Sequence, residues 1–99
     1  MSNQPAEIEI ARFVTFCIWF DTTDASNQGW AWSYGLHDEH GGEHESGPLP
    51  HRRRDCSMRT LRRALGKELG GDMRKALRGA VFVRKNENGL DNFVARVSL

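Results

Sequence analysis

The side chains best suited to chemistry in this sequence are basic, and seven of them lie between residues 52 and 67. Arginine guanidinium groups present a planar fork of donors, which suits phosphate and carboxylate groups alike. A run of three arginines followed by further arginines at helical spacing indicates either a surface that binds a negatively charged partner or an ordinary solvated helix face. We favour binding, and the predicted partner-binding basic residues are Arg52, Arg53, Arg54, Arg59, Arg62, Arg63 and Lys67.

Carboxylates form a second charged group, and the two groups divide the chain. Residues 1–50 contain one basic and eight acidic residues, a net charge of −7, whereas residues 51–99 contain 13 basic and five acidic residues, a net charge of +8. Such asymmetry is typical of a basic surface for nucleic acid or for an acidic partner. The alternative is that the two halves neutralise each other within one small domain. The acidic residues that we predict to contact a partner are Asp38, Glu39, Glu43 and Glu45.

Four histidines lie among these carboxylates, and imidazole and carboxylate groups are ligands for metal ions such as zinc. Their spacing does not match a zinc enzyme, because no pair has the helical separation of four residues together with a further ligand. His40 and His44 flank a glycine turn in a polar segment. We therefore predict exposed histidines and no metal site, for the set His37, His40, His44 and His51.

Motifs of catalysis are missing from the sequence. Asp21 ends an apolar segment, where an active-site carboxylate often lies, but the loop that follows is rich in residues that cap backbone groups. We interpret Asp21 as such a cap. No serine or cysteine has the context of a nucleophile elbow, and no glycine-rich phosphate loop is present. The prediction is a protein that is not an enzyme and that needs no cofactor.

Hydrophobic periodicity predicts the elements that must position these charges. Apolar residues alternate along residues 7–20, which is typical of a strand with one buried face. Met58, Leu61, Leu65 and Leu69 share one stripe at helical spacing. The predicted strands are residues 7–20, 30–37, 43–46, 80–85 and 92–98; the predicted helices are a main one between an Asp55 or Ser57 cap and Gly70, and a short one at residues 72–78.

The order of these elements, β-β-β-α-(α)-β-β, predicts an α+β fold. We expect one small domain over residues 1–99, with an antiparallel sheet of four or five strands and the main helix packed on one face. The predicted core residues are Val14, Phe16, Ile18, Trp30, Trp32, Leu61, Leu65 and Phe82.

Composition also bears on location. No apolar run approaches the roughly 20 residues of a membrane span. Residues 1–6 lack the basic start and apolar block of a secretory signal. Cys17 and Cys56 are expected to be reduced thiols, as in a cytoplasmic protein, and the alternative is a disulfide between them. The expectation is a protein of a host cell's cytoplasm with no membrane partner.

In outline, three strands, a helix and a further strand, with Asp21 ending the first strand, are similar to the ribonuclease H-like fold. Those nucleases hold metal with carboxylates on the first strand, in the first helix and at the fourth strand. Only Asp21 matches, because the helix position falls near Met58 and Arg59 and the fourth strand ends in Arg84 and Lys85. The outline is also similar to HicB-like antitoxins, which use a fragment of this fold as a binding module.

A second resemblance covers about a fifth of the chain. Residues 15–21, followed by Ser26-Asn27-Gln28-Gly29-Trp30-Ala31-Trp32, resemble a stretch of a type I-F anti-CRISPR protein of similar length. There an apolar strand ending in Asp leads to a Ser-Asn-Gly-Trp-x-Trp strand. This chain carries Gln28 as one inserted residue, and the resemblance does not extend to the basic helix.

Together these observations predict a non-enzymatic inhibitor that acts by protein binding, of the anti-CRISPR type encoded by phages or mobile elements. Its expected partner is a nucleic-acid-handling protein complex, such as a CRISPR effector complex, with direct contact to nucleic acid as a further possibility. The first alternative is a DNA- or RNA-binding module that uses the basic helix of residues 52–67. The second is a ribonuclease H-like nuclease, which the missing carboxylates disfavour.

Overall fold

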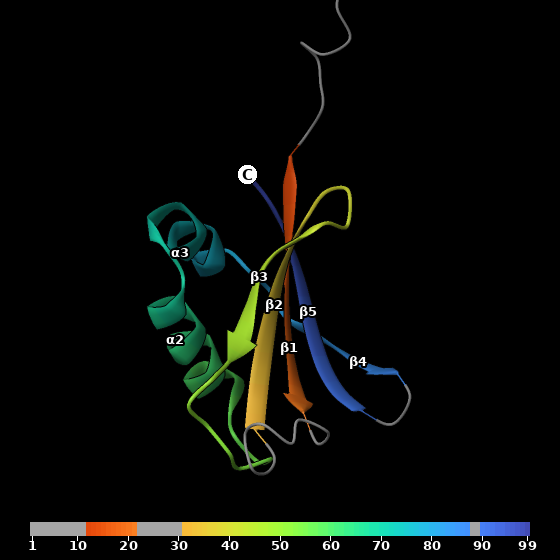
Figure 1. The fold of residues 1–99 in the computed structure, drawn as a ribbon, viewed down its shortest axis with the longest axis vertical. Helices are drawn as coiled ribbons and strands as arrows, with labels where there is room; N and C mark the ends of the chain where they lie inside the picture. Colours follow the sequence, from red (N-terminus) through yellow and green to blue (C-terminus); the bar gives the residue numbers. More distant parts are fainter. Residues whose placement is uncertain (1–11, 22–30, 88–89) are drawn as a thin grey trace, which may run out of the picture.

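In the part of the chain that the structure describes, a five-stranded antiparallel sheet has two helices packed against it (Figure 1). The computed structural model describes residues 12–21, 31–87 and 90–99. The strand order in the sheet is β3-β2-β1-β5-β4, so the first strand is central. This confirms the predicted α+β fold and the predicted order of elements. The elements are β1 (Phe13–Asp21), β2 (Ala31–Asp38), β3 (Glu43–Pro48), α2 (Met58–Glu68), α3 (Gly71–Arg78), β4 (Val83–Glu87) and β5 (Leu90–Ser98).

β1 alternates between the two faces of the sheet, as its sequence predicts. Val14, Phe16, Ile18 and Phe20 are at most 4% exposed, whereas the odd positions are half-buried. Because successive strand residues point to opposite faces, the even positions all reach the same core. β1 pairs with β2 on one side and with β5 on the other. The predicted residues 7–11 of this strand lie outside the described residues.

Both described helices cover the face that carries these even positions. Leu61 and Leu65 of α2 are fully buried in the same core cluster as Phe16 and Trp32. Six of the eight predicted core residues are therefore buried: Val14, Phe16, Ile18, Trp32, Leu61 and Leu65. Trp30 lies outside the described residues.

Phe82 departs from the prediction of a core position, because it is only partly buried and packs at the margin of the cluster. It precedes β4, an edge strand with no further strand beyond it in the sheet order. The guanidinium of Arg62 lies over its ring, 5.5 Å from the ring centre. A cation therefore covers a ring that the apolar pattern assigns to the core.

The opposite face of β2 carries small residues, which by sequence alone would allow a helix to approach. The structure instead places the Trp19 ring there. A Cβ built on Gly35 would lie 3.4 Å from Cζ3 of Trp19 and 3.2 Å from Nε2 of His37. The space that the missing side chain leaves is therefore filled by neighbouring side chains, not by a helix.

Two polar contacts set the ends of α2. The Ser57 hydroxyl accepts a hydrogen bond from the Thr60 amide at 3.2 Å, so Ser57, not Asp55, is the N-cap. At the other end, the Arg74 side chain donates to the carbonyls of Gly66 and Leu69. Carbonyls in the last turn of a helix have no partner within it, and Arg74 of α3 supplies one. The two helices are thereby joined at their junction.

Candidate functional site

Trp32, at the start of β2, holds the loop that leads into α2 by three hydrogen bonds. Its amide donates to the His51 carbonyl at 2.9 Å, and its carbonyl accepts from the Leu49 amide at 2.8 Å. Its indole Nε1 donates to the Arg53 carbonyl at 2.8 Å. The ring itself is 2% exposed and packs edge-on against Phe20. The backbone from Leu49 to Arg53 is therefore tied to the hydrophobic core.

The arginine side chains of this loop point outward from that fixed backbone. Arg52, Arg53 and Arg54 are all exposed, and the Arg53 side chain retains 86% of its accessible surface. Arg53 Nε lies 3.6 Å from Asp55 Oδ1, an exposed ion pair of the kind that contributes little to stability. The Arg54 guanidinium lies 5.7 Å from the centre of the Phe20 ring. We name residues 50–57 the basic loop.

A shallow hollow of about 520 Å³ lies between the basic loop and the first turn of α2. His51, Arg52 and Arg53 line one part of it, and the hydroxyl-bearing residues Ser57 and Thr60 line another. The first turn of α2 carries no acidic residue. Asp55, which pairs with Arg53, also lines the hollow. The arginines and hydroxyl groups at the positive end of the helix suit a phosphate or carboxylate group of a partner.

The outer face of α2 continues this positive surface. Arg59, Arg63 and Lys67 are exposed and follow one another at intervals of four residues. At 1.5 Å of rise per residue, their Cα atoms are spaced about 6 Å apart along the helix. They form a row on the side away from the buried Leu61 and Leu65. Together with the basic loop, this row is the basic surface of the protein.

Arg62 differs from the six exposed residues of the predicted set in being half-buried and bonded to the backbone of another segment. It is half-buried and donates a hydrogen bond to the Ala80 carbonyl, and it also covers Phe82. Its position beside Leu61, at the margin of the apolar stripe, is the sequence signal that separates it from the exposed arginines. The basic surface therefore consists of six of the seven predicted residues: Arg52, Arg53, Arg54, Arg59, Arg63 and Lys67.

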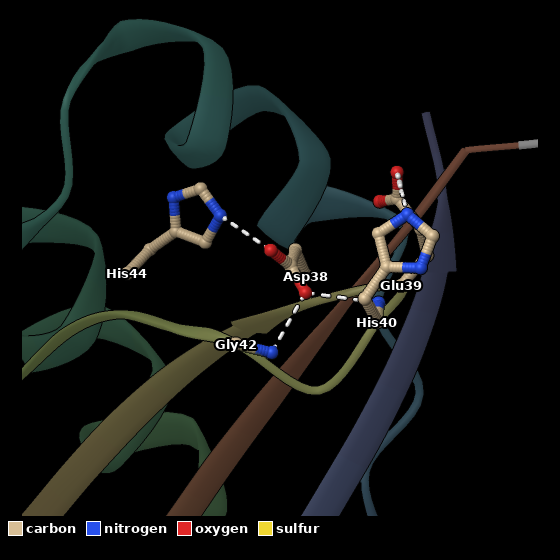
Figure 2. Close-up of polar contacts among 5 residues, drawn as sticks. All are labelled: Asp38, Glu39, His40, Gly42 and His44. Carbon is tan, nitrogen blue, oxygen red and sulfur yellow. Dashed lines mark hydrogen bonds and ion pairs between the residues drawn. The ribbon is translucent and has the colours of Figure 1, made fainter.

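The predicted acidic residues lie at the turn between β2 and β3, and Figure 2 shows how Asp38 organises that turn. Asp38 Oδ1 accepts hydrogen bonds from the amides of His40 and Gly42, at 2.9 and 2.8 Å. Its other oxygen, Oδ2, lies 3.2 Å from Nε2 of His44. Gly41 adopts φ = 85°, which glycine tolerates without strain. Asp38 is therefore chiefly a residue that closes the turn.

The other three carboxylates differ in how far they are engaged. Glu45 accepts a hydrogen bond from the buried Tyr34 hydroxyl at 2.7 Å, and burial together with this bond raises the pKa of Tyr34. Glu39 Oε1 lies 3.9 Å from Nε2 of His40. Glu43 is exposed and lies opposite His37 in the pairing of β3 with β2. This position is on the face of the sheet away from the helices. Glu43 therefore lies apart from Glu45, whereas Asp38 and Glu39 also line a hollow beside His37.

The hydrogen bonds to Asp38 predict a pH effect at this turn. The bond from the Gly42 amide, followed by those from His40 and His44, lowers the pKa of Asp38 below its usual value. A carboxylate with a lowered pKa stabilises the folded state above its unfolded pKa of about 3.9, and that contribution is lost as pH falls through the folded pKa. We expect the Gly42 amide resonance to titrate with a midpoint below about 3.9. The measurement is an NMR pH titration, with Asp38→Asn as the control that abolishes it; a midpoint at or above that value would contradict the hydrogen bonding described.

The histidines and cysteines do not gather into a metal site. Across residues 12–21, 31–87 and 90–99, no three His, Cys, Asp or Glu side chains are placed to share a metal ion. Cys17 in β1 and Cys56 beside α2 are separate thiols, and burial raises the pKa of each. Asp21 ends β1 half-buried, and β4 ends at Glu87, two residues beyond the predicted strand end at Lys85.

The basic surface and the acidic turn lie toward opposite ends of the sheet (Figure 1). Trp32, which holds the basic loop, is near the start of β2, and Asp38 is its last residue. Asp38 lies six residues after Trp32, which corresponds to about 20 Å along an extended strand. The basic loop and the acidic turn are therefore well separated, while Arg12 and Arg96 line hollows beside the acidic turn.

Comparison with known proteins adds no relative: no family model, curated protein or solved structure matches the chain. Within the part of the chain that the structure describes, none of the helices is long and apolar enough to cross a membrane.

Proposed function

We propose that this protein is a non-enzymatic inhibitor that binds a nucleic-acid-handling protein complex and makes the contact through its basic surface. The observation that carries the proposal is the attachment of the basic loop to Trp32. Three hydrogen bonds from one buried residue fix the loop backbone while the arginine side chains remain in solvent. A fixed backbone lowers the ordering cost that a flexible arginine loop would incur on binding.

The partner surface that fits this arrangement is negatively charged. Guanidinium groups bind phosphate and carboxylate groups in a bidentate manner, so the surface suits either nucleic acid held in the complex or an acidic patch of its protein. The acidic turn at the other end of β2 would repel a phosphate backbone that followed the whole molecule. This favours docking on a complex over wrapping of free nucleic acid. Within this class, the hairpin resemblance favours the anti-CRISPR type.

Inhibition assays on purified complexes test the proposal. Target-DNA binding by CRISPR effector complexes, the type I-F complex among them, is measured with and without the protein. We expect Arg63→Glu to weaken inhibition about tenfold or more, which corresponds to about 1.4 kcal/mol of binding free energy. Lys85→Glu is the matched control, because Lys85 is also exposed but lies in β4, away from the basic surface. Equal effects of the two substitutions would contradict a contact through the basic surface.

A direct DNA- or RNA-binding module is the second candidate, and the exposed row of Arg59, Arg63 and Lys67 is the observation that favours it. This candidate needs no other protein. It predicts binding to naked nucleic acid, with an affinity that falls by about 0.9 log units per log unit of salt for each phosphate contact.

A further inference from the structure

A hollow of about 290 Å³ lies at the acidic end of the sheet, between α3 and the strands β1 and β2. Its apolar lining comes from Val14 and Leu36, each 4% exposed, and from the half-buried Met73 of α3. Leu99, which is 55% exposed, lies at its margin. The hollow therefore has a hydrophobic floor.

The rim of this hollow is predominantly acidic. Among the described residues, three carboxylates line it, from Asp38, Glu39 and Glu45, together with the guanidinium of Arg12 and the imidazole of His44. The Asp38 and Glu39 side chains are only 30% and 23% exposed. A carboxylate that neighbouring residues partly cover attracts a cation more strongly than a fully hydrated one does.

The three carboxylates on the rim differ in the contacts that they already make within the protein. Asp38 uses both oxygens to close the turn and to hold His44, as Figure 2 shows. Glu45 uses Oε2 to accept from Tyr34. Glu39 Oε1 lies 3.9 Å from the exposed imidazole of His40. Asp38 therefore shapes the rim, whereas Glu39 and Glu45 are the carboxylates that can accept bonds from a ligand.

We propose that this hollow, the acidic pocket, binds an arginine side chain of a protein partner. Arginine combines a methylene stem, which packs on apolar surface, with a planar fork of donors that matches carboxylates. The floor of Val14, Leu36 and Met73 receives the stem, and Glu39 and Glu45 receive the guanidinium. The pocket lies at the other end of β2 from the basic surface, so this proposal does not depend on the proposed function.

An NMR titration of the full chain with Nα-acetyl-arginine amide tests the proposal. We expect saturable amide shifts confined to the residues around the pocket, including Leu36, Glu39 and Met73. Nα-acetyl-citrulline amide, which has nearly the same shape without the charge, is the ligand control and should produce no saturable shift. Shifts that do not saturate, or that spread evenly over the exposed carboxylates, would overturn the proposal.

A pair of neighbouring substitutions separates pocket binding from general charge attraction. Glu39 lines the pocket, whereas Glu43 belongs to the same hairpin but lies on the other face of the sheet. We expect Glu39→Gln to weaken arginine amide binding about tenfold, the effect of losing one charge-assisted hydrogen bond. Glu43→Gln should leave the affinity unchanged, and both variants should keep the dispersed spectrum of the folded protein. Equal losses in the two variants would show that net charge, not the pocket, attracts the ligand.

Discussion

Replacing Trp32 with alanine should destabilise the protein by about 3–5 kcal/mol, the range measured for buried aromatic residues. The substitution removes a ring that is 2% exposed and that packs against Phe20. It also removes the Nε1–H donor to the Arg53 carbonyl. Because small domains are stable by only about 5–15 kcal/mol, this loss is a large fraction of the free energy of unfolding. Urea denaturation followed by circular dichroism measures the change.

Trp32→Phe separates packing from hydrogen bonding at the same position. Phenylalanine keeps an aromatic ring beside Phe20 but cannot donate to the Arg53 carbonyl. We expect a smaller loss of stability, about 1–3 kcal/mol, from the carbonyl that loses its partner. Faster amide hydrogen exchange in the basic loop should accompany it. Stabilities within about 0.5 kcal/mol of wild type for both variants would show that the indole of Trp32 does not help to hold the loop.

Two substitutions on opposite sides of α2 should differ sharply in their effect. Leu65 is fully buried against the sheet, so Leu65→Ala should cost about 2–5 kcal/mol. Arg63 lies two residues earlier and is exposed, so Arg63→Ala should change stability by less than about 0.5 kcal/mol. Thermal and urea unfolding of both variants measure the difference. Similar costs at the two positions would mean that α2 is rotated from the orientation described.

Local periodicity accounts for most of the fold that could be predicted. Alternation along β1 and the leucine stripe of α2 each report which side of an element is buried, and both predictions are confirmed. Ends of elements were less well predicted. β3 extends to Pro48, two residues past the predicted end, because an edge strand tolerates proline where no further strand needs its amide.

Hydrophobic periodicity does not predict contacts between residues that are far apart in the sequence. The hydrogen bond from Trp32 to Arg53 joins residues 21 positions apart, and no local pattern in the basic loop predicts it. The same holds for Arg62 and Arg74, which bond backbone carbonyls of other segments. Sequence composition counts such arginines as surface charge, whereas the structure uses them to satisfy the backbone.

The individual roles of the acidic residues could not be predicted from the sequence either. The sequence predicts four equivalent carboxylates at a polar turn. The structure makes Asp38 the residue that closes the turn, joins Glu45 to Tyr34 and places Glu43 on the other face. A turn residue with glycines three and four positions later is the signal that could have identified the role of Asp38.

Fluorescence anisotropy at about 0.15 M salt, the physiological ionic strength, tests the central claim most directly. The labelled protein is titrated with single-stranded DNA, duplex DNA and RNA, and separately with the assembled effector complex that it inhibits. We predict binding to the complex and none to the naked nucleic acids, with Arg63→Glu weakening the former and Lys85→Glu leaving it unchanged. Tight binding to naked nucleic acid that falls steeply as salt rises would contradict inhibition through a protein complex and would identify a nucleic-acid-binding module instead.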